Sequence, residues 1–216
     1  MNTDGERKPV REGSLEKRTA ILAAARDLFV QQGVDRVSMD AVAARAEVSK
    51  RTVYDYFGDK RRLFLAILTA ASDSMLATSR RALDEHLPTD ARITTVPQLE
   101  KALTAFAIDL GTSIVGSADY AAAFALVAQQ RLQTPTTTDD LAADAASQDL
   151  ADRLAHFADA GLLDTDDTRL AADHFTALTV LLAFERQPVP ATADPEKVRQ
   201  IMIDGVRAFI RAYATR

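Results

Sequence analysis

The pattern of apolar and polar residues predicts a chain made of helices. Between Ile21 and Phe29, for example, apolar residues recur every three or four positions, so they share one face of a helix. Similar stripes predict helices over residues 15–32, 38–46, 49–57, 59–86, 97–115, 120–132, 138–160, 167–186 and 196–213. No segment has the alternation of a half-buried strand, so the sequence predicts an all-α fold.

Residues that start or stop helices fall at the ends of these stripes. Gly33 follows the first helix, where a glycine suits the left-handed backbone that often ends a helix. Asp194 and Pro195 form a cap followed by a proline at the first helical position. Gly205 lies inside the last helix, where it costs about 1 kcal/mol relative to alanine. We therefore expect Gly205 to permit the close approach of another helix.

Two short helices joined by a tight turn occupy Ser38–Lys60, the most informative stretch of the chain. Ser38 and Ser49 are expected to cap them, because a serine hydroxyl accepts hydrogen bonds from the free N–H groups of a first helical turn. In the second helix Val53 and Phe57 are four residues apart and share one face. The rest of that helix carries side chains suited to a phosphate-rich partner: Lys50, Arg51, Thr52, Tyr54, Asp55 and Tyr56.

The segment TVYDYFGDKRRLF resembles the signature that closes the DNA-binding domain of TetR (tetracycline repressor) family regulators. The matching positions are Thr52, Val53, Tyr54, Tyr56, Phe57, Lys60 and Leu63. The resemblance covers about residues 17–68, and beyond it only the order and lengths of the helices agree. It implies a three-helix DNA-binding domain with a helix-turn-helix at 15–62 and a helical ligand-binding and dimerisation domain at 63–216. Residues 1–14 are polar and are expected to form a flexible arm.

The resemblance also implies a function: a homodimeric transcriptional regulator, most often a repressor, that binds a palindromic double-stranded operator and is released by a small apolar or amphipathic ligand. Predicted DNA-contacting residues are Ser38, Ser49, Lys50, Arg51, Thr52, Tyr54, Asp55, Tyr56 and Lys60. Among these, we expect Thr52, Tyr54, Tyr56 and Lys60 to contact phosphate. Lys50 and Arg51 are expected to reach base edges. The basic N-terminal arm either lies along the duplex or is a plain mobile terminus.

Two departures from the family pattern affect this interpretation. Glu47 stands where the family most often has glycine, and a left-handed backbone would cost a non-glycine residue about 1 kcal/mol or more, so we expect a turn of different construction. Asp55 adds a carboxylate to the recognition helix. It either accepts a hydrogen bond from a cytosine amino group or pairs with Arg51 one turn earlier. The ion pair is the favoured alternative, because an unpaired acid facing phosphates is unfavourable.

The remaining helices supply the expected ligand and dimer sites. Residues proposed to line a ligand cavity, for which plain structural core is the alternative, are Phe64, Leu68, Met75, His86, Phe106, Phe124, Val127, Gln129 and Arg131. The two terminal stripes are more apolar than an outer layer needs, which suggests a four-helix contact across a two-fold axis. The predicted interface residues are Phe175, Leu178, Leu182, Val198, Ile201, Gly205 and Phe209.

Charge is distributed unevenly along the chain of 216 residues. The net charge of −5 argues by itself against a nucleic-acid partner. Residues 1–62, however, hold 13 Lys and Arg against 10 Asp and Glu, and residues 63–216 hold 13 against 21. The bases therefore collect where the DNA surface is expected, although chance clustering on solvated faces is the alternative.

Other classes of function find less support in the sequence. There are no cysteines, and Gly-rich phosphate loops, GxSxG and HExxH motifs are absent. The histidines, His86, His156 and His174, lack a second residue at metal-binding spacing, so neither a metal nor a cofactor nor a catalytic site is expected. No secretory signal or membrane-spanning run is visible, which favours a cytoplasmic location. The competing hypothesis is an all-helical enzyme or lipid carrier whose N-terminal domain only resembles a DNA binder.

Overall fold

The computed structural model describes residues 12–89, 93–117, 120–122, 125–126, 139–187 and 193–215. These residues are helical apart from short connections, and the β-type pairing among them is a single bridge between Leu163 and Ala214. The predicted all-α fold is confirmed. No described helix combines the length and apolar character needed to cross a membrane. Contacts divide the chain after Thr69 into two compact units.

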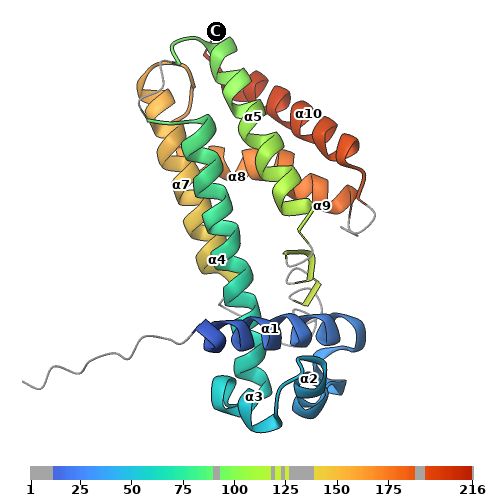
Figure 1. Ribbon diagram of the computed structural model, residues 1–216. Helices are drawn as coiled ribbons and strands as arrows, with labels where there is room; N and C mark the ends of the chain where they lie inside the picture. Colours follow the sequence, from blue (N-terminus) through green and yellow to red (C-terminus); the bar gives the residue numbers. More distant parts are fainter. Residues whose placement is uncertain are drawn as a thin grey trace, which may run out of the picture. The chain divides into compact units, whose positions relative to one another are not determined.

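The N-terminal unit contains three helices, a short 3₁₀ turn and the start of a fourth helix (Figure 1). In chain order these are α1 (Glu12–Gln32), η1 (Val34–Arg36), α2 (Met39–Arg45), α3 (Lys50–Phe57) and the first part of α4 (Lys60–His86). Their core is made of fully buried side chains such as Ile21, Val42 and Val53. The rings of Phe29 on α1 and Phe64 on α4 lie 6.4 Å apart, between centroids, and join the two helices.

The packing of α4 explains why the division falls after Thr69 rather than after residue 62. Leu63, Phe64 and Ile67 are buried but are not part of the hydrophobic core of the C-terminal unit, which begins on α4 at Ala82. The first turns of α4 therefore complete the core of the N-terminal unit.

The C-terminal unit contains the rest of α4 and the remaining helices. These are α5 (Val96–Val115), α7 (Asp139–Asp159), α8 (Thr168–Thr176), η2 (Ala177–Leu181), α9 (Leu182–Arg186) and α10 (Pro195–Tyr213). The starting signals act as predicted: Asp194 caps α10 by accepting from the N–H groups of Glu196 and Lys197. Figure 1 shows α10 running beside α5, and α7 beside α4. Two ion pairs, Arg80–Asp149 at 2.7 Å and Arg153–Asp84 at 3.0 Å, connect α7 to α4.

The helix predicted over residues 167–186 is continuous but contains a π-helical segment, η2, that the sequence did not indicate. Thr179 is fully buried within it, and its hydroxyl donates to the carbonyl of Phe175 at 2.6 Å. Gly205 of α10 lies against this segment. A Cβ at Gly205 would come within 2.2 Å of the Leu178 carbonyl oxygen. The expected close approach at Gly205 is therefore confirmed, and the neighbour is a helix of the same chain.

Replacing Gly205 with alanine is expected to destabilise the protein. The added methyl must push α10 away from η2, and overpacking of this kind costs about 1–3 kcal/mol. For a chain of this length we expect a fall in Tm of about 3–10 °C in a thermal melt followed by circular dichroism. Gly13→Ala is the matched control, since nothing lies within 4 Å of a Cβ there. Equal melting of both variants would contradict the close crossing.

Candidate nucleic-acid interface

The two serines that were expected to cap α2 and α3 do so. Ser38 Oγ accepts a hydrogen bond from the Ala41 N–H at 3.1 Å. Ser49 Oγ accepts from the Thr52 N–H at 3.0 Å and lies 2.8 Å from the Thr52 hydroxyl. The first N–H groups of a helix have no partner within the helix, and these caps supply one. The cap matters for α3, because a helix of only eight residues frays easily at its ends. These hydroxyls are thus engaged within the protein, and their contact with DNA stays a prediction.

The α3 helix has one buried and one exposed face. Val53 and Phe57 are 0% and 7% exposed and fix the helix to the core. Arg51 and Asp55 project from the other face, with side chains 90% and 67% exposed. Tyr54 is one of the few large apolar residues that stay exposed in the described part of the chain. The structure therefore has the predicted apolar, buried face of α3 and the predicted polar, exposed face.

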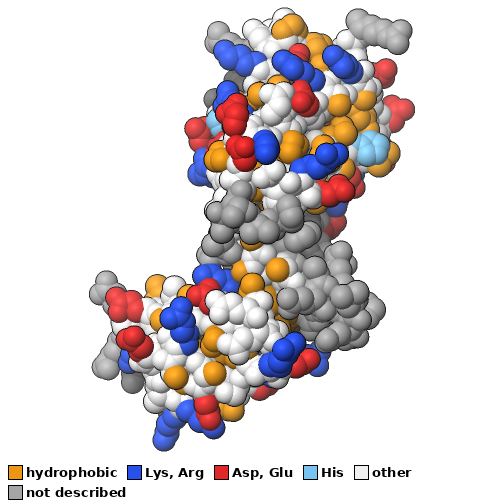
Figure 2. Space-filling model, turned by 90° about the vertical axis from the view of Figure 1, so that its right-hand side faces the viewer, with side chains coloured by type: hydrophobic (Ala, Val, Ile, Leu, Met, Phe, Trp, Pro, Cys, Tyr) orange, Lys and Arg blue, Asp and Glu red, His pale blue; other side chains and the backbone are white. Residues whose placement is uncertain are grey.

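Each cation at the start of α3 has a carboxylate partner. The Lys50 ammonium lies 2.9 Å from Asp40 of α2 and 6.0 Å from the centre of the Tyr54 ring. Its hydrogen bond to Asp40 raises the pKa of Lys50 above the usual lysine value. Arg51 pairs with Asp55 at 3.7 Å, as the favoured alternative predicted. Basic and acidic side chains are also interspersed over the face of the molecule shown in Figure 2.

Two residues expected to bind phosphate, Lys60 and Tyr56, also make hydrogen bonds within the protein, and their contact with DNA stays a prediction. The Lys60 ammonium donates to the carbonyls of Asp35 at 3.0 Å and Val37 at 3.2 Å, and so holds the segment that leads into α2. The Tyr56 hydroxyl donates to the Ser14 carbonyl at 3.0 Å and lies 2.7 Å from the Ser14 hydroxyl, which ties α3 to the start of α1. The sequence identified these positions but not their partners, because the partners are 23 to 42 residues away.

The turn between α2 and α3 has the backbone that glycine would favour, and the expectation of a different construction is wrong. Glu47 has φ of 55°, and it is the one non-glycine residue with positive φ in the described chain. The Glu47 and Val48 N–H groups donate to the Ala44 and Ala43 carbonyls at 3.3 and 3.0 Å. These bonds close the end of α2 and hold the left-handed residue in place.

Replacing Glu47 with glycine should therefore stabilise the protein. Relief of the left-handed backbone returns about 1–2 kcal/mol, and the greater freedom of glycine in the unfolded chain removes about 0.5–1 kcal/mol of that gain. We expect a rise in Tm of about 1–3 °C, measured by circular dichroism. Glu47→Ala keeps the backbone cost and serves as the control. A gain with alanine that matched the gain with glycine would point to the lost carboxylate instead of the backbone.

The predicted ligand residues fall into different environments. Phe64 and Leu68 are buried and belong to the N-terminal unit. Phe106 is 1% exposed and packs on Phe175, with ring centroids 5.8 Å apart, which makes it core. Phe124, Val127, Gln129 and Arg131 lie outside the residues whose side chains the structure describes. Met75 is partly buried against the C-terminal core, where it contacts the Tyr120 hydroxyl.

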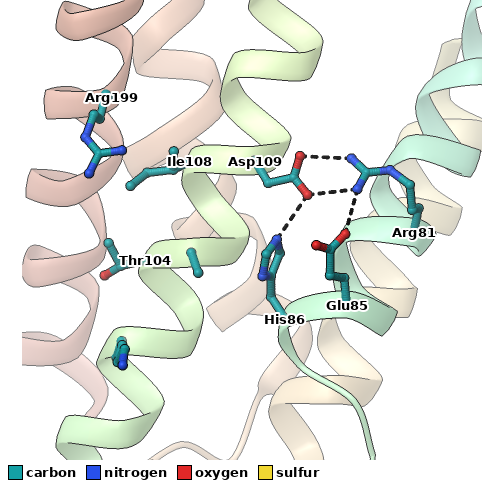
Figure 3. Close-up of a pocket in the computed structure, with 9 residues that line it drawn as sticks. Arg81, Glu85, His86, Thr104, Ile108, Asp109 and Arg199 are labelled. Carbon is teal, nitrogen blue, oxygen red and sulfur yellow. Dashed lines mark hydrogen bonds and ion pairs between the residues drawn. The ribbon is translucent and has the colours of Figure 1, made fainter.

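His86 lies in a surface groove of about 500 Å³ formed by α4, α5 and α10. Figure 3 shows Arg81, Glu85 and His86 of α4 facing Asp109 of α5, with Arg199 of α10 on the opposite side. Arg81 donates to both Asp109 oxygens, at 2.9 and 3.0 Å, and to Glu85 at 2.9 Å. His86 Nε2 lies 3.0 Å from Asp109. Hydrogen bonding from Arg81, opposed in part by burial, lowers the pKa of Asp109 below the usual aspartate value.

Glu85, His86 and Asp109 also have the geometry of a potential cation site, since one ligand atom from each lies within 4.8 Å of the others. The guanidinium of Arg81, however, already pairs with both carboxylates and offsets one of their two charges. The chemistry of this cluster is therefore that of an internal ion-pair network linking α4 to α5.

Several residues predicted at the dimer interface are instead core of the subunit. Phe175, Val198 and Phe209 are at most 2% exposed, and Gly205 faces Leu178 of its own chain. The apolar stripes of the last two helices are used mainly against one another and against α5. Leu178, Leu182 and Ile201 stay partly accessible. The strongly exposed leucines of this region are Leu170 and Leu181, at 48% and 52%, which belong to the predicted stripe but were not among the predicted interface residues.

The fold and the arrangement of α2 and α3 define a helix-turn-helix DNA-binding protein, in which a short capped helix presents its polar face to the outside. Comparison with known proteins specifies the family. A sequence model of the family "Bacterial regulatory proteins, tetR family" matches residues 21–67. A model of the "AefR-like transcriptional repressor, C-terminal domain" matches residues 101–215, more than half of the chain. The chain belongs to the TetR family of DNA-binding transcriptional regulators.

Individual relatives are similar over parts of their length. The chain is 32% identical to the HTH-type transcriptional activator FasR of Mycolicibacterium smegmatis over 147 residues, which is 62% of this chain and 64% of FasR. It is 36% identical over 75 residues to the uncharacterized regulator YhgD of Bacillus subtilis, 35% of this chain and 39% of that protein. The chain thus spans less than two thirds of the length of these relatives. They are transcriptional regulators, which supports the regulator hypothesis over the enzyme or lipid carrier.

Solved structures agree over nearly the whole chain. A putative TetR-family regulator from Mesorhizobium loti has a TM-score of 0.70 at 22% identity, covering 94% of this chain and 98% of that one. The flavonoid-responsive regulator FrrA has a TM-score of 0.63 at 28% identity, with coverage of 93% and 98%.

Proposed function

We propose that this protein is a homodimeric transcriptional repressor that binds an inverted-repeat operator and leaves it when a small apolar or amphipathic molecule binds the C-terminal unit. The observation that carries the DNA-binding part is the capped, outward-facing α3 helix with its exposed Arg51, Tyr54 and Asp55. The repressor assignment is supported by the match of residues 101–215 to the C-terminal domain of AefR-like repressors. A regulator of this kind acts on chromosomal DNA in the bacterial cytoplasm.

The dimer surface that we propose is the exposed side of α8 and η2 together with the neighbouring surface of α10. Leu170 and Leu181 expose large apolar side chains there, whereas the apolar residues behind them are already buried. Two copies meeting through this surface across a two-fold axis would bury both leucines. A two-fold dimer presents two α3 helices to successive turns of the major groove, so its operator is an inverted repeat.

The double variant Leu170→Asp, Leu181→Asp should give a folded monomer with little operator affinity. Four carboxylates would meet across the proposed interface, and one α3 alone loses the second half-site. Sedimentation velocity measures the mass, and fluorescence anisotropy with an inverted repeat selected by the wild-type protein measures binding. Leu15→Asp is the control for oligomeric state, because Leu15 is 61% exposed on α1 of the other unit. A wild-type monomer at micromolar concentration, or a dimeric double variant, would contradict this interface.

The proposed ligand site lies in the C-terminal unit beside Met75. The Tyr120 ring stacks on Phe184 at 5.6 Å between centroids, and its hydroxyl contacts the Met75 sulfur. Methionine adapts to guests of different shape, so a partly buried Met–Tyr–Phe cluster suits an aromatic or aliphatic molecule. The similarity to FrrA, a flavonoid-responsive regulator, supports this class of ligand.

The α4 helix provides the coupling between ligand and DNA. It carries Met75 in its middle and begins at Lys60, which holds the segment leading into α2. A packed helix moves as a unit, so displacing Met75 shifts the support of the DNA-binding unit. Coupling free energies of this kind are about 1–3 kcal/mol, or about 5–150-fold in affinity.

Titration of flavonoids and aliphatic alcohols by calorimetry tests this part of the proposal. We expect an apolar compound to bind, and operator DNA to weaken its binding about 5–150-fold, because coupling is reciprocal. Met75→Ala should reduce ligand affinity and leave operator affinity intact. Lys101→Ala, on the exposed face of α5, is the matched control. Tight ligand binding that operator DNA leaves unchanged would overturn the release mechanism and leave DNA binding standing.

A further inference from the structure

The ion pair between Arg51 and Asp55 lies wholly within α3. Its two charged groups lie 3.7 Å apart, on successive turns of the same helix, with side chains 90% and 67% exposed. No residue of another element holds either of them in the described structure. The buried Val53 and Phe57 anchor the opposite face of α3. The pair is therefore presented outward as one preassembled donor and acceptor.

The two lysines, at the starts of α3 and α4, are bonded to other elements. Lys50 lies 2.9 Å from Asp40 of α2, and Lys60 donates to the backbone carbonyls of Asp35 and Val37. Arg62 forms a similar local ion pair with Asp59, also at 3.7 Å, but at the start of α4 and not on α3. Lys50 and Lys60 would have to give up bonds to other elements before they reached a base edge. Arg51 can turn to a base while staying beside Asp55.

On these grounds we propose that Arg51 and Asp55 together bind one G·C base pair in the major groove, with Arg51 on the guanine and Asp55 on its cytosine. This assignment rests on the proposed operator binding. Guanine offers two adjacent acceptors, N7 and O6, to which a guanidinium donates two hydrogen bonds. The cytosine of the same pair offers its N4 amino group beside O6, and a carboxylate accepts from it. The base pair thus presents two acceptors followed by a donor, and the ion pair presents two donors followed by an acceptor, so the two patterns are complementary.

An A·T pair matches less well. Its major-groove edge runs acceptor, donor, acceptor from adenine N7 through N6 to thymine O4. Asp55 can accept from the N6 amino group. Arg51 then has a single acceptor available, either adenine N7 on one side of N6 or thymine O4 on the other. The two-bond contact that makes arginine selective is lost, so G·C is preferred.

Asp55 also has a negative role in selection. At a site with no amino group in reach, the Asp55 carboxylate gains no hydrogen bond from the DNA and is repelled by the phosphate backbone. Asp55 therefore weakens binding to unrelated DNA while it supports binding to the matched pair, and specificity is the difference between the two. Arg51 alone would bind many sequences through phosphate.

The test is selection from randomised duplexes by the full chain, followed by anisotropy titrations of the selected operator and its single-base variants. We expect one G·C pair in each half-site whose replacement by A·T weakens binding about 10–100-fold. Asp55→Asn should shift the preference at that cytosine to adenine, because an amide pairs with adenine N6 and N7. Arg51→Ala should abolish the preference for guanine there, and Asp55→Ala should raise affinity for unrelated DNA. Asp73→Asn, which removes an exposed carboxylate from the C-terminal unit, should change neither preference.

The outcomes separate the two proposals. Wild-type protein that binds no duplex at low salt would overturn the operator-binding function and this assignment with it. Selected operators with no G·C pair that responds to Arg51 and Asp55, or Asp55→Asn that keeps cytosine, would overturn the assignment and leave operator binding intact. Circular dichroism melts of each variant are the control for folding. Both side chains are on the surface and their removal leaves the buried anchors of α3 in place, so we expect unchanged melting and a preference lost through lost contacts.

Discussion

A helix of eight residues does not persist alone in water, and the whole N-terminal unit serves to hold α3. Burial of Val53 and Phe57 supplies the apolar anchor, and the Ser49 hydroxyl pairs an N–H group of the first turn. Tyr56 then ties α3 to the start of α1. These contacts leave only one face of α3 for a partner. The position of that face is set by the contacts that α3 makes with the rest of the N-terminal unit.

Lysine and arginine side chains on and beside α3 are paired with aspartates of the same unit. A surface that must approach DNA gains affinity from every free lysine or arginine, but free cations do not discriminate between sequences. Here Lys50 is matched with Asp40, Arg51 with Asp55 and Arg62 with Asp59. Each of these pairs is neutral, so the modest excess of bases over acids in residues 1–62 lies outside them. Long-range attraction is reduced, and the choice of base pairs carries more of the binding.

The sequence predicted local features well and distant contacts poorly. Helix positions and the caps Ser38, Ser49 and Asp194 follow from spacing and residue type within a few positions, and the structure has them. The π segment at η2 was missed, and it lies where Leu178 and Thr179 pack closely against Gly205 on another helix, a contact that the sequence does not show. The buried state of Phe175 and Phe209 was likewise missed. An apolar stripe shows that a face is covered, but it does not show whether the cover belongs to the same chain.

The family resemblance supplied the positions of the site but not what each side chain does there. Lys60 and Tyr56 lie where the pattern places them, yet both donate to backbone carbonyls of the same chain. Glu47 takes the left-handed conformation although it is not glycine. In each case the hydrogen bonds that fix the residue go to backbone carbonyls. Every residue has such a carbonyl, so the sequence does not show which one is used.

The place where the two units divide has a further consequence. The boundary after Thr69 lies inside α4, which continues as regular helix from Lys60 to His86. Backbone hydrogen bonds therefore span the boundary, and no extended segment is available there to enter the cleft of a protease, which requires locally unfolded chain. Digestion of the native protein should spare this junction, and the DNA-binding unit should not be released as a separate fragment unless α4 itself unwinds.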